Sequence, residues 1–457
     1  MRTLVLTVLL AACGPGPKKT DKVPGDDTAT IKGTSGTPVL QFVGDVPKNL
    51  IFVSIDTFRK DHFGPYSSKG LTPFFDKIAS EGVVMNNHHQ CSDWTFGSTT
   101  CTLAGRYNIE RGHIPRLNGN DNNRPPVPDG TPFLASWLGE AGFFSVLVSA
   151  NDWLSSNWGN TQGYTAESRP GGGSAKVKQV AVEITSAAMA TAQYDRWFMH
   201  MHHMEPHPSY NPDAEFVVGE DDLEPWPDDL RNRNLHYQNR DEWPSMSPAD
   251  QANLEAHLRV LYEGEIRMAD NRIGLNFAEL DAEGWLDDAL VVIWNDHGEQ
   301  FWEHGNQTHA YQLYGEENDG FLVFWSKNIV PGSYDRPTST IDLVPTLLDL
   351  FELPIPAEVT GYPIGTATAD RPIFMESLAR KGGVQAIVKD GYKLHYRWTG
   401  VVEFYDRSVD PLEQNDIFNP ADPKVLELWG QLRPMIEDMA PLVVGGSPFP
   451  NLPDDLP

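Results

Sequence analysis

The chain has 457 residues, including 13 Trp and 21 Phe, and 40% of its residues are hydrophobic. This is enough apolar material for one large folded domain or two smaller ones, which excludes wholesale disorder. The formal net charge is −28 at pH 7. A surface this acidic repels nucleic acid and anionic lipid, so we expect neither as a binding partner.

The N-terminus carries the pattern of an export signal. An apolar run from Leu4 to Ala12 ends at Cys13. The run is too short to cross a bilayer as a mature helix, but it has the length of a signal-peptide core. Leu10-Ala-Ala-Cys13 resembles the bacterial lipobox, which implies cleavage before the Cys and a lipid on its thiol. We therefore expect residues 1–12 to be a signal peptide, and an ordinary signal peptide with a chance Cys is the alternative.

The lipobox resemblance implies an exported lipoprotein, anchored to a membrane through Cys13 in the periplasm or at the cell surface. Residues 14–47 are rich in Pro, Gly, Thr, Asp and Lys and have no apolar periodicity, which is typical of a flexible chain. We expect residues 13–47 to be the lipidated Cys and a flexible linker, with the folded part beginning at residue 48.

Short apolar runs after residue 48 predict a buried sheet. Leu50–Ile55 and Ala289–Trp294 are nearly all apolar, as parallel strands covered on both faces are. Further predicted strands are Phe144–Val148, Trp197–His202 and Phe321–Trp325. Apolar residues recur at helical spacing from Ile266 to Leu280 and from Ile341 to Phe351. The alternation predicts an α/β fold, with a mostly parallel central sheet and helices on both of its faces.

Two segments depart from this pattern. Residues 213–250 are acidic and poor in aliphatic side chains, so we expect a surface insertion within a main domain that spans 48–369. Tyr392–Trp398 and Val401–Tyr405 alternate in polarity, which is typical of an antiparallel hairpin. We expect residues 370–457 to form a small C-terminal α+β subdomain that contains this hairpin.

The two strongest predicted strands both lead into an acidic residue, Asp56 and Asp296, and His297 follows directly. Ligands of open α/β sheets bind beyond the carboxyl ends of the strands. Two carboxylates in one pocket repel each other unless a cation lies between them, and an imidazole adds a nitrogen ligand. The trio predicts one divalent metal ion, and its ligand types are compatible with Ca²⁺, Mg²⁺, Mn²⁺ and Zn²⁺. Each Asp alone also fits a turn or a helix cap.

Two further histidines are candidates for the same crevice. His207 lies just past the predicted strand Trp197–His202, and His309 lies in a His-rich loop after Asp296. An imidazole there can serve as a neutral donor or as a cation. A plain surface loop is the alternative for the His-rich segment.

Motifs along the chain occur in an order that resembles the sulfatase branch of the alkaline-phosphatase superfamily. They are Asn49–Asp56, Arg59–Gly64, Leu71–Gly82, Thr102–Arg106, Glu205–His207, Asp296–Glu299 with Glu303–Gly305, Ile341–Thr346, and Tyr405–Asp406 with Asp410–Glu413. They cover about residues 48–420. The resemblance implies the fold of that superfamily and a metal-dependent hydrolase or transferase that acts on an anionic sulfate or phosphate ester.

The resemblance also locates a nucleophile, at the start of a helix and eleven positions before Arg106, which is Thr95. Sulfatases have Cys or Ser there, in Cys/Ser-x-Pro-x-Arg, and oxidise it to formylglycine. Here Gly97 and Thr99 replace the Pro and the Arg. Thr is neither a primary alcohol nor a thiol, so we expect no formylglycine. The hydroxyl can attack directly if a metal lowers its pKa, and a role as a helix N-cap is a compatible alternative.

Two cysteines flank that position, and neither falls at the counted place. In an exported chain, a disulfide between Cys91 and Cys101 and a pair of buried free thiols are both open.

The remaining roles also follow from the resemblance. The metal ligands would be Asp56, Thr95, Asp296 and His297. His207 and His309 would contact the transferred group and protonate the leaving oxygen.

This sequence departs from the sulfatase pattern at several points. Thr57 stands where many sulfatases have a second Asp ligand, and the family's Lys is not evident. Because of Thr95 we expect phosphoester or phosphodiester chemistry rather than classical sulfatase chemistry. The alternative is a catalytically inactive surface lipoprotein that uses the fold as a binding module.

Overall fold

A computed structural model describes residues 31–33, 39–108, 110, 126–170, 173–379 and 383–439. Cys13 and the proposed signal peptide lie outside the described residues. In the described part of the chain, no helix combines the length and the apolar character that crossing a bilayer requires.

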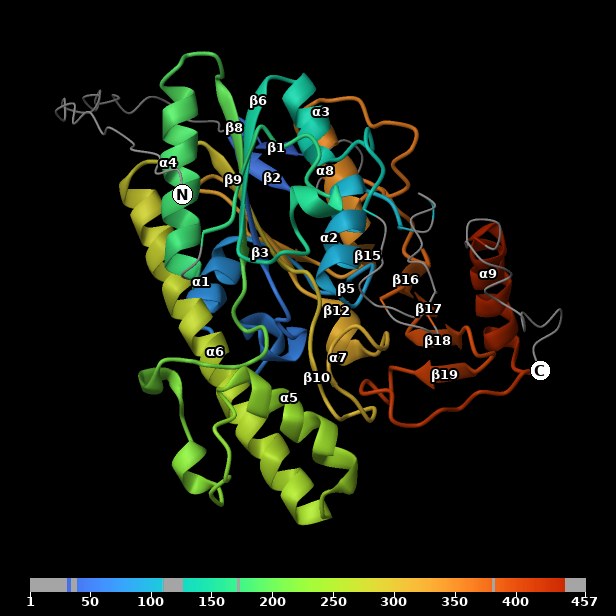
Figure 1. The fold of residues 1–457 in the computed structure, drawn as a ribbon. Coiled ribbons are helices and arrows are strands. Elements are labelled where there is room, and N and C mark those ends of the chain that lie inside the picture. Colours follow the sequence, from blue (N-terminus) through green and yellow to red (C-terminus); the bar gives the residue numbers. More distant parts are fainter. Residues whose placement is uncertain are drawn as a thin grey trace.

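The centre of the molecule is an eight-stranded sheet (Figure 1). Across the sheet its strands are β14 (Gly332–Tyr334), β4 (Val83–Met85), β13 (Leu322–Trp325), β9 (Ala289–Asn295), β3 (Asn49–Ile55), β8 (Arg196–His203), β6 (Phe143–Ser149) and β7 (Ala166–Ser168). All neighbouring pairs are parallel except the two that β13 makes, with β4 and with β9. The predicted mostly parallel sheet is therefore confirmed.

Helices cover both faces of the sheet, as the sequence predicts (Figure 1). On one face lie α1 (Pro73–Glu81), α4 (Gly173–Met189) and α6 (Pro248–Ala282); on the other lie α2 (Thr95–Ala104), α3 (Leu134–Glu140) and α8 (Leu343–Leu350). Strand β3 is packed on both of its faces. Ile51 and Val53 belong to the apolar cluster of the first face. Leu50 and Phe52 belong to that of the second. This is why its sequence reads as a continuous apolar run.

A separate antiparallel sheet follows the main one, and α9 (Pro423–Met439) packs against it. Its strands are β16 (Ile373–Ser377), β17 (Val384–Lys389), β18 (Tyr392–Arg397) and β19 (Val402–Asp406). Strands β18 and β19 pair antiparallel, which confirms the predicted hairpin.

The remaining elements are short. Paired two- and three-residue strands are β1 (Ile31–Gly33) with β2 (Gln41–Val43), β10 (Gln300–Phe301) with β11 (Gln307–Thr308), and β5 (His88–His89) with β12 (Asp319–Gly320) and β15 (Thr338–Ser339). The remaining α-helices of the described residues are α5 (Arg233–Glu242) and α7 (Gly315–Asn318); α5 lies within the segment expected to be a surface insertion.

The folded part begins earlier than residue 48. Leu40 and Phe42, which fall within the expected linker, are fully buried in the main core. The composition of residues 14–47 concealed this, because two apolar side chains in a polar stretch make no recognisable periodicity.

Candidate active site

The site lies at the carboxyl ends of the two central strands, β3 and β9. These strands are parallel neighbours, and the register places Ile55 beside Asn295. The backbone N–H of Asp296 donates to the carbonyl of Ile55 at 3.1 Å. The residues that follow the two strands, Asp56 and Asp296, are thereby brought together, as the strand-end argument predicts.

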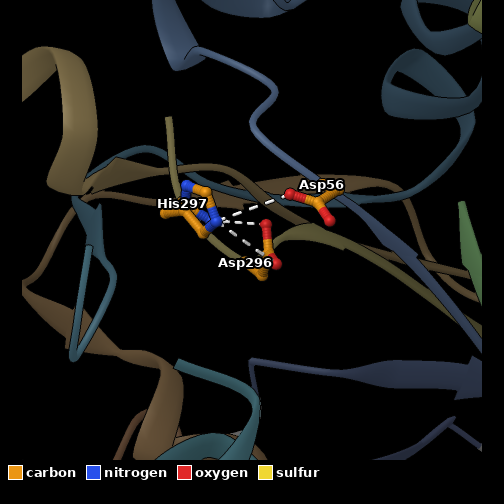
Figure 2. A group of neighbouring side chains, drawn as sticks. All are labelled: Asp56, Asp296 and His297. Atoms are coloured by element: carbon orange, nitrogen blue, oxygen red, sulfur yellow. Dashed lines mark hydrogen bonds and ion pairs between the residues drawn. The ribbon is translucent and has the colours of Figure 1, made fainter. Parts of the chain in front are cut away.

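Asp56, Asp296 and His297 form a compact, fully buried group (Figure 2). Nε2 of His297 lies 3.5 Å from Oδ1 of Asp56 and 3.6 Å from Oδ2 of Asp296. One atom from each residue lies within 4.8 Å of the other two. Two carboxylate oxygens and one imidazole nitrogen, converging on one point, are a donor set that suits a divalent cation.

The hydrogen bonds around Asp296 leave one of its oxygens facing the centre of the group. Oδ1 accepts the backbone N–H of Thr57 at 3.2 Å and that of His297 at 2.8 Å. Oδ2 of Asp296 and Oδ1 of Asp56 are buried and make no hydrogen bond to any residue that the structure describes. Buried carboxylate oxygens without a partner are costly, so the residues fit a bound cation.

Backbone strain supports this arrangement. Thr57 has φ of 55°, a left-handed conformation that is unfavourable for a β-branched residue. The turn points its N–H at Asp296, and its own hydroxyl is not directed to any described partner. Thr57 therefore contributes its backbone N–H to the site, at a position where many sulfatases have an Asp.

Burial and mutual charge shift the acidity of the group. Burial first, and the charge of Asp56 second, raise the pKa of Asp296 well above its usual range. Burial also acts to raise the pKa of Asp56, but the nearby histidines His207, His202 and His297 outweigh it, and the net pKa is lowered. Two carboxyl groups this close do not both ionise at low energy without a cation between them.

His297 is set up as a neutral ligand. Burial lowers its pKa well below the usual range, with the charge of His309 as the second cause. Its Nδ1 lies 2.9 Å from the carbonyl of Gly298, so Nδ1–H donates there and Nε2 keeps its lone pair. That lone pair faces Asp56, Asp296 and Thr95.

Thr95 is the first residue of α2 and lies beside this group. Its Oγ1 lies 3.4 Å from Oδ2 of Asp56 and 3.4 Å from Nε2 of His297. The helix N-cap is Trp94, whose side chain makes no capping bond, and Thr95 is the first helical residue. The alternative that Thr95 serves as the N-cap is thus wrong, because the chain turns into the helix one residue earlier.

Asn151 is a site residue that the sequence analysis missed. It follows β6, and its Nδ2 donates to Oδ2 of Asp56 at 2.6 Å and to Oγ1 of Thr95 at 3.1 Å. The N–H of Trp153 donates to Oδ1 of Asn151 at 2.9 Å, which fixes the orientation of the amide. The available signal was its place three positions after the predicted strand Phe144–Val148, and a single Asn there also fits a turn.

His309 and His207 lie at the more exposed side of the group. The ring of His309 is 4.4 Å from that of His297 and 5.2 Å from that of His207, measured between centroids. Nδ1 of His309 lies 3.3 Å from Oε1 of the fully buried Glu299. Among the described residues, the structure therefore brings together the site residues named from the sequence, and it adds Asn151 and Glu299.

The motif segments also meet in space. Arg59, which is almost fully buried, donates to the carbonyl of Glu299 at 3.0 Å and to the carboxylate of Glu303 at 2.5 Å. This links the segment after β3 to the loop that carries the histidines. Cys91 and Cys101 form a disulfide that ties the approach to α2 to the body of the helix, so neither is a free thiol.

Comparison with known proteins agrees with this geometry. The sequence model of the sulfatase family matches residues 48–353. YidJ of Escherichia coli K12, an uncharacterised sulfatase, is 24% identical over 416 residues, which cover 81% of this chain and 83% of YidJ.

Solved structures with low identity share the fold. The phosphonate monoester hydrolase of Silicibacter pomeroyi has a TM-score of 0.62 and 19% identity, over 85% of this chain and 94% of its own. The protein BT4656, solved with D-glucosamine-2-N,6-O-disulfate, has a TM-score of 0.64 and 17% identity, over 86% and 98%. The family model matches most of the folded part of the chain, and the similar proteins agree with it. The chain therefore belongs to the sulfatase family of the alkaline-phosphatase superfamily and is an ester hydrolase of that family.

Proposed function

We propose that the protein is a metal-dependent hydrolase or transferase that acts on phosphate esters in preference to sulfate esters, with Thr95 as its nucleophile. The observation that carries this proposal is the position of the Thr95 hydroxyl. It lies at the N-terminus of α2, 3.4 Å from Asp56 and 3.4 Å from His297, in a buried group that suits one cation.

Asp56, Asp296 and His297 would hold a divalent metal ion, with Thr95 as the fourth ligand. Such an ion, when bound, would neutralise the two carboxylates and favour the ionised form of the Thr95 hydroxyl. The donor set does not choose among Ca²⁺, Mg²⁺, Mn²⁺ and Zn²⁺.

The choice of phosphate over sulfate follows from the side chain of Thr95. A formylglycine hydrate can release sulfate by expelling it from a carbon that bears a second hydroxyl. Thr95 has no second hydroxyl and cannot be converted, so an ester formed on its oxygen must be cleaved by attack on phosphorus or sulfur. Alcohol nucleophiles of this kind are well suited to phosphoryl transfer through a covalent intermediate.

The two histidines and solvent together account for the proton transfers. As the bond from Oγ1 of Thr95 to phosphorus forms and the ester bond breaks, the hydroxyl proton is released to solvent. The leaving oxygen takes a proton from His207 or His309. In the second half of the reaction that imidazole accepts a proton from the attacking water, whose oxygen bonds to phosphorus as the bond from phosphorus to Oγ1 of Thr95 breaks. Thr95 then takes back a proton from solvent, and phosphate departs. An alcohol in place of water gives a transferase.

Three features orient this reaction. The amide of Asn151 holds the Thr95 hydroxyl at 3.1 Å, and the carboxylate of Glu299 lies 3.3 Å from Nδ1 of His309, which directs the other nitrogen of that ring. The first-turn N–H groups of α2 favour an anion at the helix start.

We propose that the protein is exported and meets its substrate outside the cytoplasm. We propose that Cys13 carries a lipid and that the residues between Cys13 and β1 connect it to the folded part; the support is the lipobox resemblance. Similar proteins include a phosphonate monoester hydrolase and a protein solved with a disulfated glucosamine, so both anion classes belong in the test.

A metal-by-substrate panel tests the proposal. The purified protein, stripped of metal and resupplied with each of the four cations, is assayed on an aryl sulfate, an aryl phosphate monoester and a phosphate diester. We expect turnover of a phosphate ester that depends on added metal. Faster turnover of the sulfate would contradict the phosphate preference, and a protein that binds metal but turns over none of the three would favour the binding-module alternative.

A further inference from the structure

A line of hydrogen bonds runs from Asp56 along one face of the sheet to Tyr164, away from the reacting group. Oδ2 of Asp56 lies 3.4 Å from Nε2 of His202, and Nδ1 of His202 lies 2.8 Å from Oγ of Ser54. Oγ of Ser54 lies 2.8 Å from Nε2 of His200, and Nδ1 of His200 lies 2.8 Å from the hydroxyl of Tyr164. We call Ser54, His200, His202 and Tyr164 the inner chain.

The inner chain lies in the interior of the protein, at positions on β3 and β8 where a sheet covered on both faces usually has apolar side chains. Ser54 lies on β3, and His200 and His202 lie two residues apart on β8, so all three point to the same side of the sheet. Each of the three is fully buried. Polar groups at the centre of a sheet covered on both faces destabilise the fold unless each has a partner, and here every polar atom of the three side chains has one.

Aromatic neighbours fix the ring of His200. The ring of Phe52 lies 5.5 Å from it in an edge-on arrangement, and that of Phe198 lies 6.2 Å away, stacked. Burial lowers the pKa of His200 well below its usual range, so this imidazole is neutral.

If each imidazole carries one proton and Asp56 is ionised, a single assignment gives every contact of the chain one donor and one acceptor. Nε2–H of His202 donates to Asp56, which leaves Nδ1 of His202 as an acceptor for the Ser54 hydroxyl. Ser54 then accepts from Nε2–H of His200, and Nδ1 of His200 accepts from the Tyr164 hydroxyl. All donors therefore point towards Asp56, and reversing one bond would leave a pair of facing donors or facing acceptors.

The two oxygens of Asp56 have separate environments as a result. Oδ2 accepts hydrogen bonds from His202 at 3.4 Å, from Asn151 at 2.6 Å and from Thr95 at 3.4 Å. Oδ1 makes no hydrogen bond to any described residue and lies 3.5 Å from Nε2 of His297. The donors on Oδ2 hold the carboxylate so that Oδ1 faces the cation site.

We propose that the inner chain is a positioning device for Asp56: it fixes His202 as the Nε2–H tautomer and thereby holds Oδ1 of Asp56 towards the bound cation. The proposal rests on the metal site of the proposed function. Its effect is on affinity for the cation, since none of these four residues reaches the reacting atoms. Partners of this kind typically change metal affinity by about 10- to 100-fold.

Titration of the protein with Mn²⁺ alone, followed by calorimetry, tests this without substrate. Ser54→Ala removes the hydroxyl that sets the tautomer of His202, and we expect Mn²⁺ to bind about tenfold more weakly. Tyr164→Phe removes only the far end of the inner chain, and we expect a loss of about threefold, the effect of one hydrogen bond. Wild-type affinity in both variants would overturn the proposal.

Matched controls separate the inner chain from general damage to the core. Ser145 is a fully buried Ser on β6 that contacts Thr165 and Gly163, and Ser145→Ala should leave Mn²⁺ affinity unchanged. The hydroxyl of Tyr66 donates to a backbone carbonyl at 2.9 Å, and Tyr66→Phe should also leave it unchanged. Equal losses in a variant and its control would contradict a specific role.

A second readout is independent of metal. Nitrogen NMR of ¹⁵N-histidine-labelled protein should show His202 and His200 with a protonated Nε2 and an unprotonated Nδ1, and Tyr164→Phe should move the Nδ1 signal of His200. A protonated Nδ1 on His202 would overturn the inner chain. If wild type binds no Mn²⁺, the metal part of the proposed function fails, and this measurement still decides the tautomers.

Discussion

The hydroxyl oxygen of Thr95 lies 3.4 Å from Nε2 of His297, although 202 positions separate the two residues in sequence. The contact joins the start of α2 to the end of β9, and it exists because His297 donates from Nδ1 to a backbone carbonyl and turns Nε2 inward. A hydroxyl, an imidazole lone pair and two carboxylates then share one buried space. Each prediction below follows from a residue in or near that space.

Removing a metal ligand should abolish cation binding and leave the fold intact. Asp296→Ala and His297→Ala each delete one converging donor, and we expect the affinity for Mn²⁺ to fall by more than the roughly 100-fold upper range of indirect partners. Circular dichroism of both variants should remain that of wild type; in Asp296→Ala, removing one of two repelling carboxylates also relieves strain in the metal-free protein. His257→Ala, which changes a buried His on α6, is the control and should keep its metal. Unchanged metal content in either site variant would refute the ligand assignment.

Asn151→Ala should lower turnover by about 10- to 100-fold with a smaller effect on KM. The amide donates to Asp56 at 2.6 Å and to Thr95 at 3.1 Å, so its loss frees both groups that must be aligned for attack. The matched control is Asn160→Ala, since Asn160 is also fully buried and its amide donates to the carbonyl of Trp153 instead. Equal turnover in the two variants would show that Asn151 has a structural role and does not align Asp56 and Thr95 for the reaction.

Glu265 should make the stability of the protein depend on pH. It is almost fully buried, and burial raises its pKa from 4.5 to about 7. Because the folded state holds this proton more tightly than the unfolded chain, its contribution is fully present below the unfolded pKa and is lost as pH rises through about 7. We compare the free energy of unfolding of Glu265→Gln with that of wild type at two pH values. The difference, variant minus wild type, should be about 3 kcal/mol larger at pH 8 than at pH 4.5.

Urea unfolding at the two pH values measures this difference. Glu183→Gln changes an exposed carboxyl on α4 and should follow the pH dependence of wild type. If the difference in free energy of unfolding between wild type and Glu265→Gln were the same at both pH values, the pKa of the Glu265 carboxyl would not be raised in the folded protein.

The mature protein should begin at Cys13 and carry lipid. The lipobox resemblance motivates this, and Cys13→Ser removes the thiol that would be modified. Intact mass of the membrane fraction should show the added lipid in wild type, and the variant should lose it. A wild-type N-terminus at another residue would make the resemblance accidental.

The central fold and most of the site are predictable from local sequence because they depend on strand ends. Continuous apolar runs mark β3 and β9, and the acidic residues after them must meet if the strands are neighbours. The three-residue strands β4 and β14 carry no comparable pattern, since three residues cannot display a period. Helix α5 could not be predicted for a different reason: even its buried residues, His236 and Asn239, are polar, so it shows no apolar stripe.

Asn151 and the inner chain could not be predicted because their roles depend on contacts across strands. The His residues of β8 appear in the sequence only as an alternating run, and nothing local places Ser54 between His200 and His202. That placement arises from the parallel register, which sets Ser54 beside His202. Pairing between distant strands is a property of the whole sheet, and a single sequence does not display it.

The central claim is that Thr95 is the nucleophile, and it predicts the activity of three substitutions at this position. Thr95→Ser should retain turnover, because the hydroxyl remains and the methyl group that crowds it is removed. Thr95→Cys should not yield a sulfatase, since Gly97 and Thr99 stand where the maturation motif has Pro and Arg. Thr95→Ala should lose most turnover and still bind inorganic phosphate, because the helix N-terminus and both histidines remain.

The most direct measurement is peptide mass analysis of the metal-loaded protein, quenched in acid during turnover of the phosphate ester that the panel identifies. We expect one added phosphoryl group on Thr95 in wild type, and none in Thr95→Ala, whose turnover should be almost abolished. An unmodified Thr95 in wild type, together with near-wild-type turnover in Thr95→Ala, would contradict the claim and leave Thr95 as a structural residue at the start of α2.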